Sequence, residues 1–289
     1  MTKRTYTSQF LYVAERKIVI AMYSFTIKPI SRLNGGSALK VAAYQNRGKL
    51  FDEREKTIYD FTHKTDLLYT NIFLPENAPL EFFDSQILWN EAEKMEKRYD
   101  ARTGRAVIAA LPNELTLEEQ INLVEKFVTE AFIKYGMCAD IAIHSGHREN
   151  ELSANRHLDQ VLPNNPHVHI LLADRPVDRD GFCPKKNRDW NKKVLVRQWR
   201  KLWAEIQNRE FEYKKLKVRV SHESLEVQQI NREPTIHLGR KVMEMERRGK
   251  DTERRKINRN IEKQNKERQE LERQYQLERT QEYEFKRSR

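Results

Sequence analysis

The chain has 289 residues and a formal net charge of +11, because 54 lysines and arginines stand against 43 acidic residues. No apolar run has the length of a membrane-spanning helix, and no small-residue cleavage site follows the first apolar segment, so we expect neither an integral membrane protein nor a secreted one. The two cysteines, Cys138 and Cys183, form no disulfide framework or CxxC site. These features predict a cytoplasmic protein whose positive charge suits a polyanionic partner such as nucleic acid.

The first part of the chain is predicted to be an extension followed by a strand, a loop and a helix. Residues 1–21 lack regular patterning, whereas apolar and polar residues alternate over 23–28 as they do in a strand. A turn-rich loop follows, and Ser37 at its end is a suitable N-cap for a helix over 38–44. We then expect strands over 58–61 and 67–74 and a helix over 80–99.

The second half continues the alternation of strands and helices. Thr116 and Glu119 match a capping box, which opens a predicted helix that extends to about residue 135. The other predicted elements are strands over 105–111 and 139–144, a polar loop over 145–165, a strand that contains His167 and His169, and a helix over 190–211. Residues 240–289 are mostly charged and sustain no heptad, so they are predicted to form a helical or disordered tail.

This order of elements predicts an α/β (α+β) fold over residues 22–239. Strands interleaved with helices suggest a two-layer sandwich, in which a central, mainly antiparallel sheet of about five strands is flanked by helices. A parallel doubly wound sheet is disfavoured, since no glycine-rich phosphate loop follows a strand. The loop over 34–37 lacks both the Walker lysine and the GxGxxG spacing, so no nucleotide cofactor is expected.

The motif Asn165-Pro166-His167-Val168-His169 carries the strongest chemical signal in the chain. On a strand, residues i and i+2 point to the same face, so His167 and His169 present two imidazoles side by side. Two nitrogen ligands on a rigid backbone suit a divalent metal, although a half-buried strand can also carry two histidines by chance.

A third imidazole is available at the end of the preceding predicted strand. His144 joins His167 and His169 in one face if the two strands are neighbours, and three imidazoles leave coordination positions open for phosphate oxygens and water. His147 and His157, in the intervening loop, compete with His144 for the third position.

A metal that polarises a phosphate also needs a nucleophile, and Tyr44 is the candidate. It lies on the predicted helix after the glycine-containing loop, and small residues precede it. A tyrosine hydroxyl can attack a phosphodiester and retain the phosphate covalently. Tyr23 and Tyr59 are the alternatives, but both lie within strand-like patterns.

Basic residues are concentrated in two segments, residues 185–197 and residues 214–219. In a protein that binds a single strand of DNA they would contact phosphates, although such residues often only face solvent. The candidate DNA-binding residues are Lys185, Lys186, Arg188, Lys192 and Lys193.

Taken together, these motifs resemble the MobA/MobL family of plasmid mobilisation relaxases. The similarity extends in order over about residues 22–248 and includes Ala42-Ala43-Tyr44, Ala142-Ile143-His144 and the PHxH motif. Further matching blocks lie at residues 22–28, 30–32, 36–38, 110–116, 188–190, 199–205 and 232–239.

The resemblance implies an HUH-class endonuclease that nicks one strand at the nic site of a transfer origin. Tyr44 would form a 5′-phosphotyrosyl intermediate that is later resealed, and His144, His167 and His169 would bind Mg²⁺ or Mn²⁺. The implied partners are single-stranded origin DNA, accessory relaxosome proteins and a coupling protein.

Two other functions remain open at this stage. A rolling-circle replication initiator or a single-tyrosine transposase would use the same HUH chemistry at a different kind of origin. A non-catalytic single-stranded DNA-binding protein would carry the histidines for structural reasons.

Overall fold

The computed structural model describes residues 19–20, 23–146 and 165–287. Nearly all of the predicted extension over 1–21, and both His147 and His157, lie outside these residues. The chain divides into two compact units, residues 1–222 and 223–289. The boundary predicted at residues 21/22 from the onset of regular patterning, and the boundary predicted at 239/240 from charge, stay predictions.

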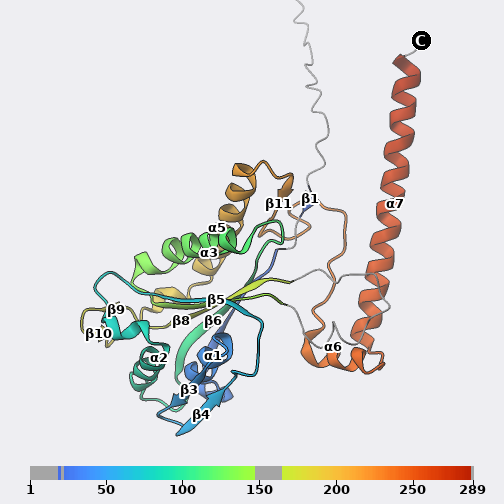
Figure 1. Cartoon of the computed structure of the whole chain (residues 1–289). Coiled ribbons are helices and arrows are strands. Elements are labelled where there is room, and N and C mark those ends of the chain that lie inside the picture. Colours follow the sequence, from blue (N-terminus) through green and yellow to red (C-terminus); the bar gives the residue numbers. More distant parts are fainter. Residues whose placement is uncertain (1–18, 21–22, 147–164, 288–289) are drawn as a thin grey trace, which may run out of the picture. The chain divides into compact units, whose positions relative to one another are not determined.

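A five-stranded sheet with the order β2-β6-β8-β7-β5 forms the centre of the first unit (Figure 1). Every neighbouring pair in it is antiparallel. The strands are β2 (Phe25–Ser31), β6 (Arg102–Ala110), β8 (His167–Ala173), β7 (Ala139–His144) and β5 (Leu67–Phe73). The predicted fold class, an α+β fold around a five-stranded antiparallel sheet flanked by helices, is therefore confirmed.

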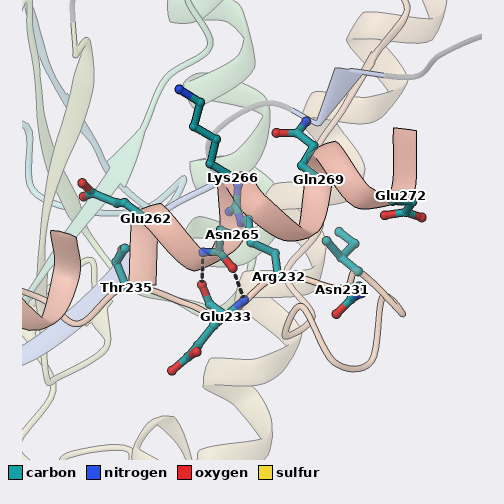
Figure 2. Close-up of a pocket in the computed structure, with 10 residues that line it drawn as sticks. Asn231, Arg232, Glu233, Thr235, Glu262, Asn265, Lys266, Gln269 and Glu272 are labelled. Carbon is teal, nitrogen blue, oxygen red and sulfur yellow. Dashed lines mark hydrogen bonds between the residues drawn. The ribbon is translucent and has the colours of Figure 1, made fainter. Parts of the chain in front are cut away.

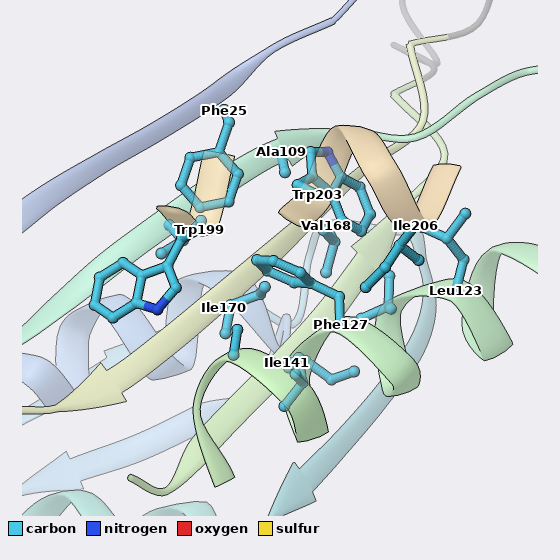
Figure 3. Packing of buried hydrophobic residues seen from close by; sticks show 14 of the residues in the cluster. Phe25, Ala109, Leu123, Phe127, Ile141, Val168, Ile170, Trp199, Trp203 and Ile206 are labelled. Atoms are coloured by element: carbon cyan, nitrogen blue, oxygen red, sulfur yellow. The ribbon is translucent and has the colours of Figure 1, made fainter. Parts of the chain in front are cut away.

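One face of the sheet packs against helices α3 (Leu117–Ala131) and α5 (Lys193–Tyr213). The rings of Phe127 and Trp203 meet edge to face with their centroids 5.0 Å apart, in the same buried cluster as the strand residues Val168 and Ile170 (Figure 3). Burial of these large side chains contributes to the hydrophobic stabilisation of the layer. The even-numbered residues of β8 from Val168 to Leu172 are buried in this core, so its odd-numbered residues lie on the opposite face of the sheet.

The other face carries helices α1 (Ala38–Gln45) and α2 (Ser85–Lys94), together with the hairpin of β3 (Lys49–Asp52) and β4 (Thr57–Asp60). Ser37 caps α1, as predicted, because its side chain accepts from the backbone N–H of Lys40. Ala38 and Ala42 are fully buried, and their small side chains let α1 lie close to the sheet.

The register of β7 and β8 assembles the histidines. His144 pairs directly with His167, and Ala142 pairs with His169, so all three imidazoles lie on the face that α1 covers and at the same end of the sheet. The two strands are therefore neighbours in the sheet, as the placement of His144 beside His167 and His169 requires.

Two predicted helices begin and end at different residues in the structure. The helix expected over 80–99 is a short 3₁₀ helix, Leu80–Phe83, followed by α2, because the side chain of Asp84 caps the N–H groups of Gln86 and Ile87. The helix expected from residue 190 is preceded by a 3₁₀ turn, Arg188–Asn191, and α5 itself begins at Lys193. The remaining strands are β1 (Val19–Ile20), β9 (Val177–Asp178), β10 (Gly181–Phe182) and β11 (Val218–Arg219).

The second unit contains α6 (Gly239–Arg247) and the long helix α7 (Glu253–Arg287). Asn258 and Asn265, two helical turns apart on α7, each exchange a pair of hydrogen bonds with the backbone, of Ile236 and Glu233 respectively. A groove of about 540 Å³ lies beside Asn265, between the residues before α6 and α7 (Figure 2). Within the described ranges, no helix combines the length and the apolar character that crossing a membrane requires.

Candidate metal centre and nucleophile

Three histidines form one cluster where β7 ends and β8 begins. The ring centroids of His144 and His169 are 4.6 Å apart, those of His167 and His169 are 5.1 Å apart, and the possible ligand nitrogens all lie within 4.8 Å of one another. Nitrogens that share one metal lie about 3.4 Å apart in tetrahedral geometry, so side-chain adjustments of an ångström would complete a site. A set of three imidazoles fits a divalent transition metal.

Hydrogen bonds orient two of the imidazoles. The Nδ1–H of His167 donates to the carbonyl oxygen of Asn165 at 2.8 Å, which leaves its Nε2 lone pair available. In His144, Nε2 lies 2.7 Å from the carbonyl oxygen of Gln45 and Nδ1 lies 3.1 Å from Nη2 of Arg47. Since a guanidinium only donates, Nδ1 accepts and Nε2–H donates. A metal that used Nδ1 of His144 would therefore have to displace the Arg47 hydrogen bond.

Burial keeps the two inner imidazoles neutral. Burial, together with the charge of Arg47, lowers the pKa of His144 to about 4. Burial and the neighbouring histidines lower the pKa of His169 to about 3. Neutral imidazoles keep the lone pairs that metal coordination needs.

Tyr44 projects from the end of α1 toward this cluster. Its ring centroid lies 6.1 Å from that of His169 and 5.4 Å from that of Phe61. Two cations flank the ring: the guanidinium carbon of Arg47 is 4.5 Å and the ammonium of Lys64 is 5.1 Å from its centre. The predicted nucleophile and the three predicted ligands are therefore brought together.

The alternative tyrosines lie elsewhere. The hydroxyl of Tyr23 donates to the carbonyl oxygen of Arg200 at 2.7 Å, on the opposite face of the sheet, and burial raises its pKa. Tyr59 packs against the core around α1, where burial and the nearby carboxylates of Asp52 and Glu55 raise its pKa. In the described part of the chain, neither ring is paired with a histidine of the cluster.

Sequence reasoning missed an ion pair beside the cluster. Arg47 binds both carboxylate oxygens of Asp66, at 2.7 and 2.8 Å, and also donates to the backbone oxygen of Tyr44. Burial would raise the pKa of Asp66, but the hydrogen bonds and charge of Arg47 outweigh it and hold the pKa at about 2. Arg47 adopts a φ of 50°, a left-handed conformation that costs about 1 kcal/mol or more and persists where side-chain contacts fix it. The sequence feature that could have indicated Arg47 is its position three residues after Tyr44, just beyond the predicted helix.

A second missed group is the buried carboxylate of Asp140. It accepts from the indole of Trp89 at 2.8 Å and from the hydroxyl of Ser85 at 2.7 Å, and it also accepts from the amides of Gln45 and Asn46. Burial raises its pKa. The network ties the end of α1 to β7, one residue beyond Tyr44. Its sequence signal was a charged residue within an apolar strand.

The predicted DNA-binding lysines lie at the other end of the sheet. They follow the C-terminal end of β8, and a seven-residue strand spans about 20 Å. Lys185, Arg188 and Lys193 are exposed. Lys186 instead forms an ion pair with Glu96 at 2.9 Å, and Lys192 forms one with Asp189 at 2.9 Å. The structure does not bring this segment to the histidines.

Comparisons with known proteins identify the family. The MobA/MobL family model matches residues 36–248. The chain is 31% identical over 255 residues to mobilization protein MobL of Acidithiobacillus ferridurans, a match that covers 82% of the chain and 67% of that protein. It is 32% identical over 250 residues to conjugal transfer protein TraA of Agrobacterium fabrum, which covers 76% of the chain but only 21% of TraA.

A solved structure shares the fold. It is described as "Molecular Basis of Vancomycin Resistance Transfer in Staphylococcus aureus", superposes with a TM-score of 0.61 at 33% identity, and covers 71% of the chain and all of the solved chain. The sequence motifs, the antiparallel sheet and these relatives agree, and the chain belongs to the MobA/MobL family of plasmid mobilisation relaxases.

Proposed function

We propose that the chain nicks one strand of a plasmid transfer origin by transesterification, with Tyr44 as the nucleophile. The observation that carries the proposal is the position of the Tyr44 ring, 6.1 Å from that of His169 and beside the three-histidine cluster. The names of the relatives, which are mobilization and conjugal transfer proteins, support the same role.

The reaction exchanges one phosphodiester for another. The Tyr44 oxygen forms a bond to phosphorus while the bond from phosphorus to the 3′-oxygen breaks; the phenol loses its proton and the 3′-oxygen gains one. The strand's 5′-phosphate stays on Tyr44. Reversal by a free 3′-hydroxyl reseals the strand, so the cycle needs no ATP.

His144, His167 and His169 would hold the metal, which we propose to be Mg²⁺ or Mn²⁺. When bound, it would act as a Lewis acid on the scissile phosphate. Arg47 fixes the backbone at Tyr44 and lies against its ring, which aligns the phenol with the histidine cluster. Asp140 holds the adjoining end of α1 against β7.

Residues 22–239 would form the nicking domain, and residues 240–289 a tail available to accessory relaxosome proteins or a coupling protein. The reaction would take place in the cytoplasm on single-stranded origin DNA.

The test uses single-stranded oligonucleotides that tile the DNA next to the mobilisation gene, with Mn²⁺ present and protein–DNA adducts separated on a denaturing gel. Wild type is expected to form an adduct with one oligonucleotide, and Tyr44→Phe none. Tyr59→Phe is the matched control and should retain the adduct. Adducts in Tyr44→Phe would refute the nucleophile, and their absence in wild type would refute the nicking activity. Cleavage of a replication origin instead would favour an initiator.

A further inference from the structure

A short turn beside the proposed nucleophile combines aromatic rings with a lysine ammonium. Residues 61–64, called here the 61–64 turn, follow β4, and the backbone N–H of Phe61 donates to Gly48 just beyond α1 at 3.0 Å. Asp60 closes the turn by accepting from the backbone and hydroxyl of Thr62, at 3.0 and 2.7 Å. The turn is thus fixed next to the end of the helix that carries Tyr44.

The aromatic side chains of the turn continue from the nucleophile outward. The Phe61 ring meets Tyr44 edge to face at 5.4 Å, and the ring of His63 lies 6.4 Å from that of Phe61 at an angle of 39°. Phe61 is half-buried and His63 is exposed. Rings that are held in place and open to solvent provide surfaces on which unpaired bases stack.

Lys64 supplies the positive charge of the turn. The ammonium of Lys64 lies over the Tyr44 ring, 5.1 Å from its centre, and within the described residues no carboxylate pairs with it. The neighbouring cation, Arg47, is by contrast bound by both oxygens of Asp66. A half-buried cation that pairs with no carboxylate of the described residues, and that lies beside the proposed nucleophile, is suited to a phosphate oxygen.

We propose that the 61–64 turn is the single-stranded DNA-binding element of the site, in which Lys64 contacts the phosphate at Tyr44 and the rings of Phe61 and His63 stack with an adjoining base. This inference rests on the proposed nicking function, since it assigns residues to that substrate. It places recognition of DNA at the histidine end of the sheet, independently of the lysines at the other end.

Binding of two fluorescent oligonucleotides separates the two kinds of contact. One is an oligothymidine of about 20 nucleotides, and the other is an abasic strand of the same length that keeps the phosphates and lacks the bases. Neither contains a transfer origin, so affinity is measured by anisotropy on the full-length protein apart from cleavage.

Each variant has a matched control. Lys64→Gln should weaken binding of both strands and reduce the slope of log affinity against log salt by about 0.7, whereas Lys97→Gln, which removes an exposed charge at the other end of the sheet, should not. Phe61→Leu and His63→Ala should each weaken oligothymidine binding about fivefold or more and leave abasic binding unchanged. Phe51→Leu, an exposed aromatic on β3 of the same hairpin, should change neither.

The possible outcomes separate the two proposals. Equal behaviour of Lys64→Gln and Lys97→Gln, or of Phe61→Leu and Phe51→Leu, would overturn the assignment of the turn even if wild type forms the covalent adduct. If wild type forms no covalent adduct but the variants of the turn still differ from their controls in binding, the nicking function is refuted and the assignment of the turn to DNA binding is retained. Thermal melting by circular dichroism checks that Phe61→Leu folds; His63→Ala carries the stacking test if it does not.

Discussion

The two ends of the central sheet differ in how many of their charged and ionisable side chains are paired with one another. At the end of β6 and β8 away from the histidines, Arg105 is buried against Asp174 at 2.5 Å and Arg175 pairs with Glu96 at 2.9 Å. Nearby, Arg32 is buried against Glu93 at 2.7 Å. At the histidine end, Arg47 also pairs with Asp66, at 2.7 Å, but the three imidazoles, the Tyr44 ring and the Lys64 ammonium lie beside that pair.

This difference separates residues that maintain the fold from residues that await a ligand. A buried ion pair satisfies itself, and removal of one partner leaves an uncompensated charge. The three imidazoles and the Lys64 ammonium, which pairs with no carboxylate of the described residues, are instead placed to gain further partners when a metal and a phosphate bind. We therefore expect substitutions at the histidine end to reduce mainly activity, and substitutions at the other end to reduce mainly stability.

The largest expected effect is on activity. His169→Ala should reduce adduct formation by about 1,000-fold or more, since it removes one of the three proposed ligands from the metal that stabilises the phosphate charge. The amount of adduct formed over time with the cognate oligonucleotide gives the rate. Affinity for single-stranded DNA should change less than twofold, and a parallel loss of binding would contradict a role confined to the metal.

The largest effect on stability is expected at the other end. Arg105→Met should lower the free energy of unfolding by about 3–5 kcal/mol, because it leaves Asp174 buried without its partner. Urea denaturation measures this change. The double variant Arg105→Met/Asp174→Leu should recover much of the loss, and adduct formation under folding conditions should stay near wild type in both. A loss of adduct formation without a loss of stability would contradict the assignment of Arg105 to the fold and not to activity.

An intermediate effect follows from the histidine pKa values. His144 and His169 titrate at about 4 and 3 in the folded chain, below the ordinary value of 6.5, so between these limits the unfolded chain binds more protons. Stability is therefore retained above pH 6.5 and lost as pH falls toward 4, by about 1.4 kcal/mol per pH unit for each histidine. Urea denaturation with EDTA at a series of pH values measures the slope. His169→Ala should flatten it; an unchanged slope would exclude the buried neutral imidazole as its source.

The smallest effect is expected from the exposed lysines away from the site. Lys185→Gln/Lys193→Gln should reduce single-stranded DNA affinity by only about two- to threefold at low salt, and reduce the slope of log affinity against log salt by less than the value of about 0.7 for one phosphate contact. Adduct yield at saturating DNA should be unchanged. Anisotropy titrations at several salt concentrations provide the measurement, and an unaltered slope would remove these lysines from the DNA-binding surface.

Local patterns in the sequence predicted the parts of the molecule that depend on near neighbours. The capping box at Thr116 and the N-cap at Ser37 act over three residues, and both are present. The HxH spacing fixes two imidazoles on one face for the same reason. His144 could be added because antiparallel neighbours end and begin at one edge of a sheet.

The parts that the sequence did not predict depend on distant contacts. Asp66 meets Arg47 across 19 residues, and Asp140 meets Trp89 across 51, so no periodicity within either segment reports the pair. The overlong helix prediction for 80–99 failed at a single capping residue, Asp84, where local hydrogen bonding overrode helix propensity.

The direct pairing of His144 with His167 has a consequence for the evolution of the site. The register of β7 and β8 decides which residues bring the imidazoles together, and the carbonyl oxygen of Asn165 orients that of His167. This register does not fix the number of residues in the connection before Asn165. Insertions and deletions there are expected to leave the chemistry intact, which makes the connection a place where relatives can diverge in length. An insertion of one residue inside either strand would turn one imidazole to the opposite face and eliminate the centre.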